Sequence, residues 1–455
     1  MHTIQNKNFT EETNLARGLG LPSAVSIVIS RIIGSGIFRT PGPIMALVGS
    51  TLLFGSVWII GAVITIFAAV CYAELVAMMP RSGGPYIYLK EAYGPLIAFL
   101  RGWAMFFVSE TGAIAAVALV FAEYAQASLA ISSGIYLSHT VVVIIALLVI
   151  VFHTVINCFG VKLSGIVQII ISSSKVIALG YIIIACFAKN GNVSNFYTPL
   201  LPEHFTFTHI LGIGAALRYA FFAFSGWEGA TYVAEEVKNP RKNLPLSLLI
   251  GIVCVLILYM GANAAYLFQI PVEEFSLSKW IAVDALQRAL GAVGALLVAY
   301  AVMINTFGNV GTQVMVKART WHAMAQDNLF FSWCANVHKK YKTPNNAMII
   351  QGVWACVLVL FASMYKNSYE AVIDYFSATG TIFNILTLAS VIVLRRKYPD
   401  VVRPFKTWGY PATVILVVLF YVIYLIVTLI TAFIPSLLGI VLTSTGLIYY
   451  WIKIK

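Results

Sequence analysis

Two interrupted hydrophobic runs hold the groups best suited to binding a small molecule. The run 24–47 is broken at Gly34-Ser35-Gly36, and the run 210–233 is broken at Phe224-Ser225-Gly226. Backbone groups stay unpaired inside a membrane only where they line a cavity or meet a ligand. Two glycine-broken membrane helices, one opening each half of a chain, therefore indicate the substrate site of a transporter.

Each break offers one half of a receptor for an α-amino acid. The first leaves N–H groups at the start of a half-helix, where partial positive charge favours a carboxylate. The second leaves carbonyl oxygens at the end of a half-helix, where partial negative charge favours an ammonium group. The residues predicted to bind the carboxylate are Gly34, Ser35, Gly36 and Ile37. Those predicted to bind the amino group are Ile32, Phe222, Ala223, Phe224 and Ser225.

Ionisable side chains within the hydrophobic runs are the next candidates, because intramembrane charge is costly and usually functional. Arg31 precedes the first break, and its candidate partners are Glu110 and Glu228. A pair between Arg31 and Glu110, the favoured arrangement, would leave the pocket effectively neutral. A free Arg31 would favour an anionic substrate side chain, and a free Glu110 a cationic one. Arg218 adds positive charge near the outer mouth or extends to the interface.

Membrane helices must position these residues. The chain has 455 residues, 60% hydrophobic and 10% charged, a composition that excludes a soluble protein. With about 20 apolar residues needed per span, it divides into about twelve helices. These start near residues 23, 52, 97, 139, 164, 209, 246, 291, 347, 369, 412 and 434.

The spacing of the two breaks predicts an all-α integral membrane protein with an inverted five-plus-five repeat, in which spans 1 and 6 are broken at the midplane. The predicted parts are a cytoplasmic tail (1–20), a first repeat (21–190), an inverted second repeat (209–400) and two additional helices (410–455). The alternative is that Gly34 and Gly36 only allow close helix packing. It fits less well, because such glycines usually recur four residues apart.

The net charge of +12 follows membrane topology rather than nucleic-acid binding. With the N-terminus in the cytoplasm, most Lys and Arg residues between spans fall on the inner face, which is the positive-inside pattern. Lys317 is placed there too, at the start of a polar loop (317–346), whereas Arg39 belongs to the sparse outer set. We therefore predict a multi-pass protein of the cell membrane with both termini in the cytoplasm.

Five motifs together resemble the amino acid–polyamine–organocation superfamily, most closely the prokaryotic relatives of the L-type amino acid transporters. The motifs are IIGSGIF (32–38), PRSGGPYIYLKEAYG (80–94), FSGWEGA (224–230), EEVKNPRKNLP (235–245) and RPFKTWGYP (403–411). The resemblance runs from about Gly18 to the end of span 11. It implies the LeuT-type fold, in agreement with the predicted repeat. Arg31 departs from the family, which usually has a small or neutral polar residue before this first motif.

The resemblance implies roles for several residues. Phe222 corresponds to an aromatic gate that closes over bound substrate, and Trp227 is a second gate candidate at the pocket floor. Lys175 stands where sodium-coupled relatives bind a cation and would tether span 5 to span 1, so sodium dependence is not expected. Glu228 corresponds to a proton-sensitive glutamate of the arginine–agmatine antiporter, or is a permanently paired structural carboxylate. Glu110 corresponds to a position that faces the substrate side chain.

These features favour a sodium-independent amino acid transporter that works by alternating access. Exchange is the expected mode, because the L-type relatives mostly exchange, and small or medium neutral amino acids are the default substrates. The alternatives are proton-coupled uptake of a charged amino acid and a non-transporting amino acid sensor. An enzyme is not expected, since the chain carries no recognisable nucleophile–base pair or metal motif.

The expected partners are the lipid bilayer and the amino acid substrate, with no nucleic acid, cofactor or metal. Animal L-type transporters join a heavy chain through a cysteine in the outer loop after span 3. The corresponding loop (131–139) contains no cysteine, so a covalently attached heavy chain is not expected. The outer segment 271–290 has helical periodicity and is predicted to be a short surface helix, either a lid or a plain connector.

Overall fold

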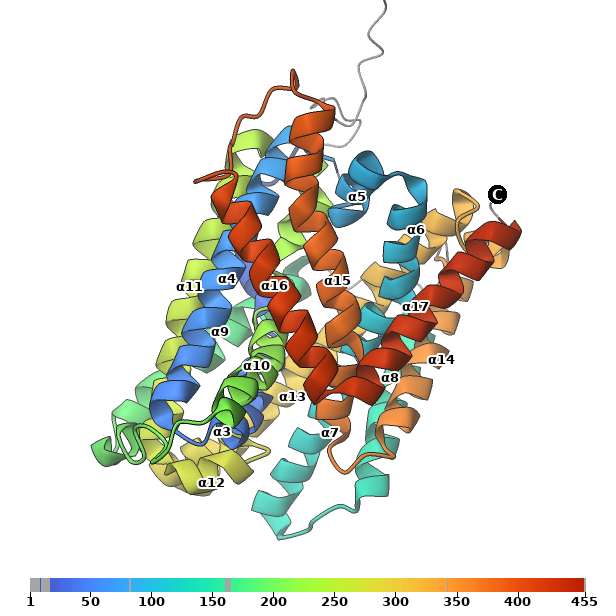
Figure 1. The fold of residues 1–455 in the computed structure, drawn as a ribbon. Helices are drawn as coiled ribbons and strands as arrows, with labels where there is room; N and C mark the ends of the chain where they lie inside the picture. The colour runs from blue at the N-terminus through green and yellow to red at the C-terminus, as the bar shows by residue number, and fades with distance from the viewer. Residues whose placement is uncertain (1–8, 10–16, 82, 160–164, 342, 454–455) are drawn as a thin grey trace, which may run out of the picture.

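Long apolar helices run between the two ends of the molecule, and short helices lie at these ends (Figure 1). The structure is a computed structural model that describes residues 9, 17–81, 83–159, 165–341 and 343–453. Within these residues, eleven helical segments are long and apolar enough to cross a membrane. Helix α9 (Gly165–Phe187) supplies the remaining span of the twelve predicted. Most of the tail 1–20 lies outside the described residues.

Most unbroken spans begin within a few residues of the predicted positions, but the spans that start at Pro240 and Ile281 begin earlier than the predicted 246 and 291. The unbroken spans are α4 (Thr51–Met78), α6 (Pro95–Ala104) continued by η2 (Met105–Ser109) and α7 (Glu110–Ser133), α8 (His139–Cys158), α9, α11 (Pro240–Gln269), α13 (Ile281–Gln326), α14 (Asn345–Ala362), α15 (Ser368–Lys397), α16 (Ala412–Thr431) and α17 (Phe433–Lys453). The short connecting helices are α5 (Pro85–Tyr93), η3 (Val193–Phe196), α12 (Val272–Leu277) and η5 (Ser332–Ala335).

Both predicted breaks are present. The first span consists of α1 (Leu21–Ile32), then α2 (Gly36–Arg39) and α3 (Pro41–Val48). The second consists of α10 (Phe207–Ala223) and the 3-10 helix η4 (Trp227–Glu236). Gly226, with φ of +90°, makes the turn between them in a conformation that a side chain would disfavour. The arrangement of these broken spans within an all-helical bundle is that of the LeuT-type fold.

The segment 271–290 differs from the single surface helix that was predicted. It forms α12 and the first turns of α13, and α13 is kinked at Gly291, where φ is +70°. Helix α12 is packed tightly on α3, because a Cβ atom at Gly42 would lie 2.3 Å from the carbonyl oxygen of Ser278. Phe275 is fully buried in this contact region. The segment is therefore an integral part of the helix packing in this structure.

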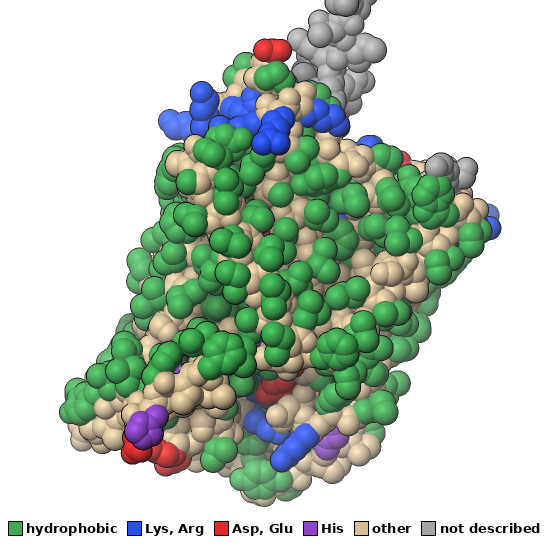
Figure 2. Space-filling model, viewed as in Figure 1, with side chains coloured by type: hydrophobic (Ala, Val, Ile, Leu, Met, Phe, Trp, Pro, Cys, Tyr) green, Lys and Arg blue, Asp and Glu red, His purple; other side chains and the backbone are tan. Residues whose placement is uncertain are grey.

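Hydrophobic side chains cover much of the face shown in Figure 2 between the two ends of the molecule. Large apolar residues are exposed on the outer helices, such as Leu148 on α8 and Leu416 on α16. Because exposed apolar surface of this extent suits lipid rather than water, the chain is a multi-pass membrane protein. Lys and Arg side chains gather at the end where α15 finishes with Arg395, Arg396 and Lys397 (Figure 2). We call this the basic end.

Candidate substrate-binding site

A cavity of about 290 Å³ lies between the two helix breaks, bounded also by α7, α13 and α15. Most of the predicted site residues line it. These are Arg31, Ile32, Gly34, Ser35, Gly36, Glu110, Lys175, Arg218, Phe222, Ser225, Trp227 and Glu228. Three predicted residues do not line it: Ile37, Ala223 and Phe224, whose side chains are buried in the core. The sequence therefore located the cavity but not the direction of every side chain.

The first break lies at the cavity and leaves backbone N–H groups without a partner. Helix α1 ends at Ile32, and the chain turns through Gly34 and Ser35 before α2 begins. The N–H groups of Ser35, Gly36 and Ile37 have no hydrogen-bond acceptor among the described residues. Gly36 also contacts the second break directly, since a Cβ atom there would lie 2.5 Å from the Cα atom of Ala223. The donors predicted from the sequence are thus present and lie against α10.

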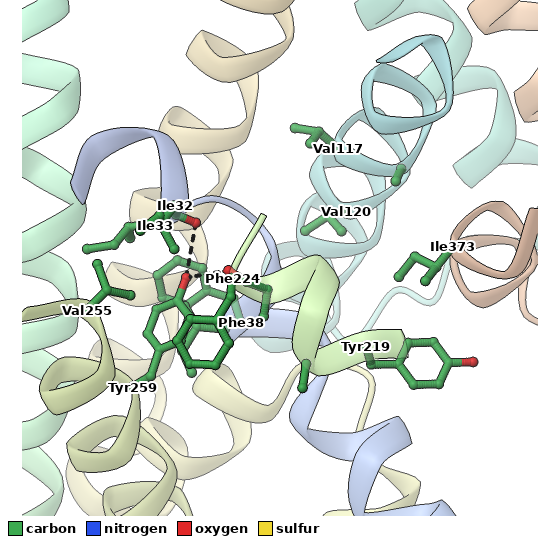
Figure 3. Close-up of a cluster of buried hydrophobic side chains, with 14 of the residues drawn as sticks. Ile32, Ile33, Phe38, Val117, Val120, Tyr219, Phe224, Val255, Tyr259 and Ile373 are labelled. Carbon is green, nitrogen blue, oxygen red and sulfur yellow. Dashed lines mark hydrogen bonds between the residues drawn. The ribbon is translucent and has the colours of Figure 1, made fainter. Parts of the chain in front are cut away.

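The carbonyl groups of the second break are more occupied than the sequence implies. The Phe222 oxygen accepts hydrogen bonds from the Ser225 amide, at 3.0 Å, and from its hydroxyl, at 2.7 Å. The Ala223 oxygen accepts from the Tyr259 hydroxyl at 3.0 Å, and the same hydroxyl lies 3.1 Å from the Ile32 oxygen (Figure 3). Since a hydroxyl has one hydrogen and each carbonyl has two lone pairs, both oxygens keep capacity for a further donor.

Tyr259 was not singled out by sequence reasoning, yet it joins the two breaks from α11. Its ring packs against Trp58 and Phe224 with ring centroids 5.8 and 5.3 Å apart. Phe224 therefore packs within this aromatic cluster (Figure 3) and does not line the cavity. A tyrosine in an apolar helix carries no spacing signal that would reveal such a contact.

The proposed aromatic gate lies in a layer of rings. Phe222 packs against Tyr369 and Phe376 of α15, with centroids 5.9 and 5.6 Å apart. Further toward the end opposite the basic end, the buried Arg39 guanidinium pairs with Glu123 at 2.6 Å and with Glu370 at 3.0 Å. Arg39 was assigned to the outer surface from the sequence, but its side chain is only 1% exposed. This side of the cavity is closed by rings and by a buried ion-pair cluster.

On the side toward the basic end, Trp227 packs edge-on against Tyr72, with centroids 4.7 Å apart. Arg81, which follows α4, forms an ion pair with Glu235 of η4 at 2.9 Å. This second layer connects the broken sixth span to the segment that follows α4.

Lys175 lies where the family resemblance places a tether. Its Nζ atom donates a hydrogen bond to the carbonyl oxygen of Ser30 at 3.1 Å, joining α9 to the last turn of α1. The side chain is buried, so it does not extend to the membrane interface.

Arg218 is likewise buried rather than extended to the interface. Its Nε atom pairs with Asp374 of α15 at 2.7 Å, and its guanidinium also bonds to Thr431 of α16. Its positive charge is thus offset by an adjacent carboxylate.

The favoured pair between Arg31 and Glu110 is not formed. Glu110 instead pairs with Lys317 of α13. The sequence placed Lys317 in an inner loop, but α13 continues to Gln326 and carries this lysine into the bundle. The spacing of Asn309, Gln313 and Lys317, four residues apart, was the available signal, because it puts three polar side chains on one helix face.

Arg31 pairs with neither of its two candidate partners, Glu110 and Glu228. Its stem crosses η4 at Gly229, where a Cβ atom would lie 2.1 Å from the Arg31 Cδ atom. Its guanidinium carbon lies 5.8 Å from the ring centroid of Tyr232. Among the described residues, its side chain forms no ion pair or hydrogen bond, and its Nε atom is buried without a partner.

Arg101 of α6 is a lining residue that sequence reasoning missed. It is 8% exposed, lies over the ring of Phe383 at 5.6 Å, and its Nε atom also has no partner. In the sequence it lies near the start of span 3, where an arginine is typical of the membrane interface. The sequence therefore did not indicate that its side chain lines the cavity.

A model of the amino acid permease family matches residues 19–454. The chain belongs to this family. Its members are transporters rather than enzymes, as predicted. The permease is 32% identical over 450 residues to the human large neutral amino acids transporter small subunit 2, covering 97% of this chain and 81% of the relative. It is 30% identical to the mouse b(0,+)-type amino acid transporter 1, covering 90% and 83% of the two chains. It is also 30% identical to the human cystine/glutamate transporter, with 87% and 77% covered.

Proposed function

We propose that this permease is a sodium-independent amino acid exchanger that works by alternating access. The observation that carries the proposal is the meeting of two broken helices at one cavity. One break offers unpaired amide donors, and the other offers carbonyl oxygens with spare lone pairs. The relatives named as amino acid transporters support the same substrate class.

In this proposal the substrate carboxylate binds the amide groups of Ser35 and Gly36 at the start of α2. Its ammonium group binds the carbonyl oxygens at the ends of α1 and α10, including that of Ile32. Donors fixed in the backbone are already oriented before substrate arrives, which reduces the free energy lost on ordering.

The place of Lys175 supports the proposed sodium independence. Its ammonium group already donates to the Ser30 oxygen, so a fixed positive charge occupies the junction between α9 and α1. A sodium ion at the same junction would be repelled by this charge and would compete for the same oxygen.

Alternating access requires the two closing layers to open in turn. One is the ring layer around Phe222 together with the Arg39 ion pairs. The other includes the Trp227–Tyr72 contact and the Arg81–Glu235 pair. By the positive-inside rule we place the basic end in the cytoplasm, with both termini on that side. The repeat boundaries 21–190 and 209–400 remain part of this proposal.

We also propose that the permease works without a covalently attached heavy chain. The connection between α7 and α8, residues 134–138, contains no cysteine to form such a bond.

The test is uptake by purified permease in liposomes, with and without unlabelled amino acids inside, in sodium-free buffer. We expect labelled amino acid to enter only loaded liposomes, and added sodium to leave the rate unchanged. Uptake into empty liposomes driven by a pH gradient would replace exchange by proton coupling, for which Glu228 is the cavity carboxylate. Absence of uptake for every amino acid would contradict the proposal and favour the sensor alternative.

A further inference from the structure

The charges around the cavity do not balance. Five cationic side chains line it: Arg31, Arg101, Lys175, Arg218 and Lys317. Only Glu110 and Glu228 oppose them from the lining, and Asp374 opposes them from behind Arg218. The site therefore carries two more positive than negative charges with every group in its ordinary state.

This excess falls on Arg31, Arg101 and Lys175, which only Glu228 is left to oppose, and Lys175 already donates to the Ser30 oxygen. Glu110 is taken by Lys317 and Asp374 by Arg218, whereas Arg31 and Arg101 form no ion pair among the described residues. Each has a buried Nε atom without a hydrogen-bond partner. Their other guanidinium nitrogens form no hydrogen bond among the described residues either, so both groups are available to pair with an anion in the cavity.

The two guanidinium groups act on the same region of the cavity, although they come from α1 and α6. Both side chains line this one cavity together with Glu110 and Glu228. Both arginines are also held from behind by rings, Arg31 by Tyr232 and Arg101 by Phe383. Arginine presents a planar fork of donors that matches a carboxylate, so a second carboxylate is the group these residues fit best.

We propose that the transported substrate is an acidic amino acid, whose side-chain carboxylate is recognised by Arg31 and Arg101. The inference rests on the proposed function, because the backbone groups of the breaks would hold the α-carboxylate and α-ammonium groups. Arg31 lies directly before Ile32, so its side chain starts next to the backbone part of the site. A cationic substrate is disfavoured, since Glu110 already has a lysine partner and only Glu228 would oppose the added charge.

The experiment compares substrates that differ in charge and hardly in shape. Wild-type permease is reconstituted in liposomes loaded with unlabelled glutamate and glutamine, and labelled glutamate or glutamine is supplied outside. We expect glutamate to be preferred by at least about tenfold, as a charge-assisted pair allows. The same comparison is made for aspartate and asparagine.

Two variants then test which residues recognise the side-chain carboxylate of the substrate. Arg31→Gln and Arg101→Gln should each lower the glutamate-to-glutamine ratio by about tenfold or more, mainly by raising KM for glutamate. Lys366→Gln is the matched control, because it removes one positive charge from an exposed position between α14 and α15. Thermal unfolding in detergent and the elution profile in size-exclusion chromatography check that each arginine variant is folded.

The outcomes separate this inference from the proposed function. Exchange of neutral amino acids without exchange of acidic ones would overturn the inference and leave the exchanger intact. Unchanged glutamate preference in both arginine variants would also overturn it. If the wild type exchanges no amino acid at all, the proposed function itself fails.

Discussion

One buried ammonium group distinguishes the centre of this permease from a cation-binding site. Lys175 reaches the Ser30 oxygen from α9, and the side chain is surrounded by protein. Its charge acts without any ion that must enter or leave. Under the proposed sodium-independent mechanism, we expect the junction to be unaffected when sodium is removed from the solution.

Lys175→Met keeps the length of the side chain but removes the donor. We expect exchange to fall by at least about tenfold, because the last turn of α1 loses its hydrogen bond from a charged group. The measurement is the initial rate of amino acid exchange in loaded liposomes. Lys189→Met, an exposed position beyond the end of α9, is the control. A Lys175 variant with the wild-type rate would show that the tether is dispensable.

At the scale of elements, the relative position of the two broken spans depends on a close backbone contact rather than on side-chain packing. Gly36 of α2 faces Ala223 of α10 so closely that no Cβ atom fits between them. This contact sets the distance between the donor break and the acceptor break.

Gly36→Ala should therefore weaken substrate binding by at least about tenfold, since the two half-helices must separate and misplace the donors. The readout is the substrate concentration that half-saturates exchange. Gly55→Ala in α4 is the matched control, because a Cβ atom there meets nothing within 4 Å. Gly55→Ala should be neutral or stabilise the helix by about 1 kcal/mol or less. Equal effects of the two substitutions would contradict the assigned role of the contact.

The Arg39 cluster joins α2, α7 and α15 by charge. Removing the arginine in Arg39→Met would leave Glu123 and Glu370 near each other without their cation. We expect this to cost about 3–5 kcal/mol of stability in the closed arrangement. Arg288→Met removes a more exposed pair with Glu274 and should cost about 1 kcal/mol or less. Thermal unfolding of both variants in detergent tests the difference, and a larger loss for Arg288→Met would contradict it.

The breaks and the span positions could be predicted from the sequence, whereas the ion pairs could not. Glycines at 34, 36 and 226 interrupt apolar runs. This signal is local in the sequence and can be recognised without knowing which helices pack together. The partner of Glu110 depends on how far α13 extends and on which face it turns inward. The polar residues near 317 were assigned to a loop because the same residue types occur in water-exposed loops and in polar cavities. Arg101 was missed for the same reason.

At the scale of the whole molecule, charge is distributed unequally between the two ends (Figure 2). The basic end holds Arg395 and Arg403, both paired with Glu74 of α4. Part of the basic excess is thus structural, and the remainder is available to favour the proposed cytoplasmic position of this end.

A reporter fused after Lys455 should therefore report a cytoplasmic position. We expect fluorescence from a fused fluorescent protein and no activity from fused alkaline phosphatase, which needs an exported environment. A phosphatase fusion at Gly134, between α7 and α8, should be active and serves as the opposite control. The reverse pattern would invert the proposed orientation and exchange the roles of the two closing layers.

The single hydroxyl of Tyr259, shared between Ile32 and Ala223, has a consequence for movement (Figure 3). It lies within hydrogen-bonding distance of both half-helix ends, and in the proposed mechanism it keeps these ends at one spacing. A point fixed in this way acts as a fulcrum, about which the longer arms can swing. The permease would then open at either surface while its centre stays in place. The bound substrate would remain near this point while the surrounding helices change their tilt.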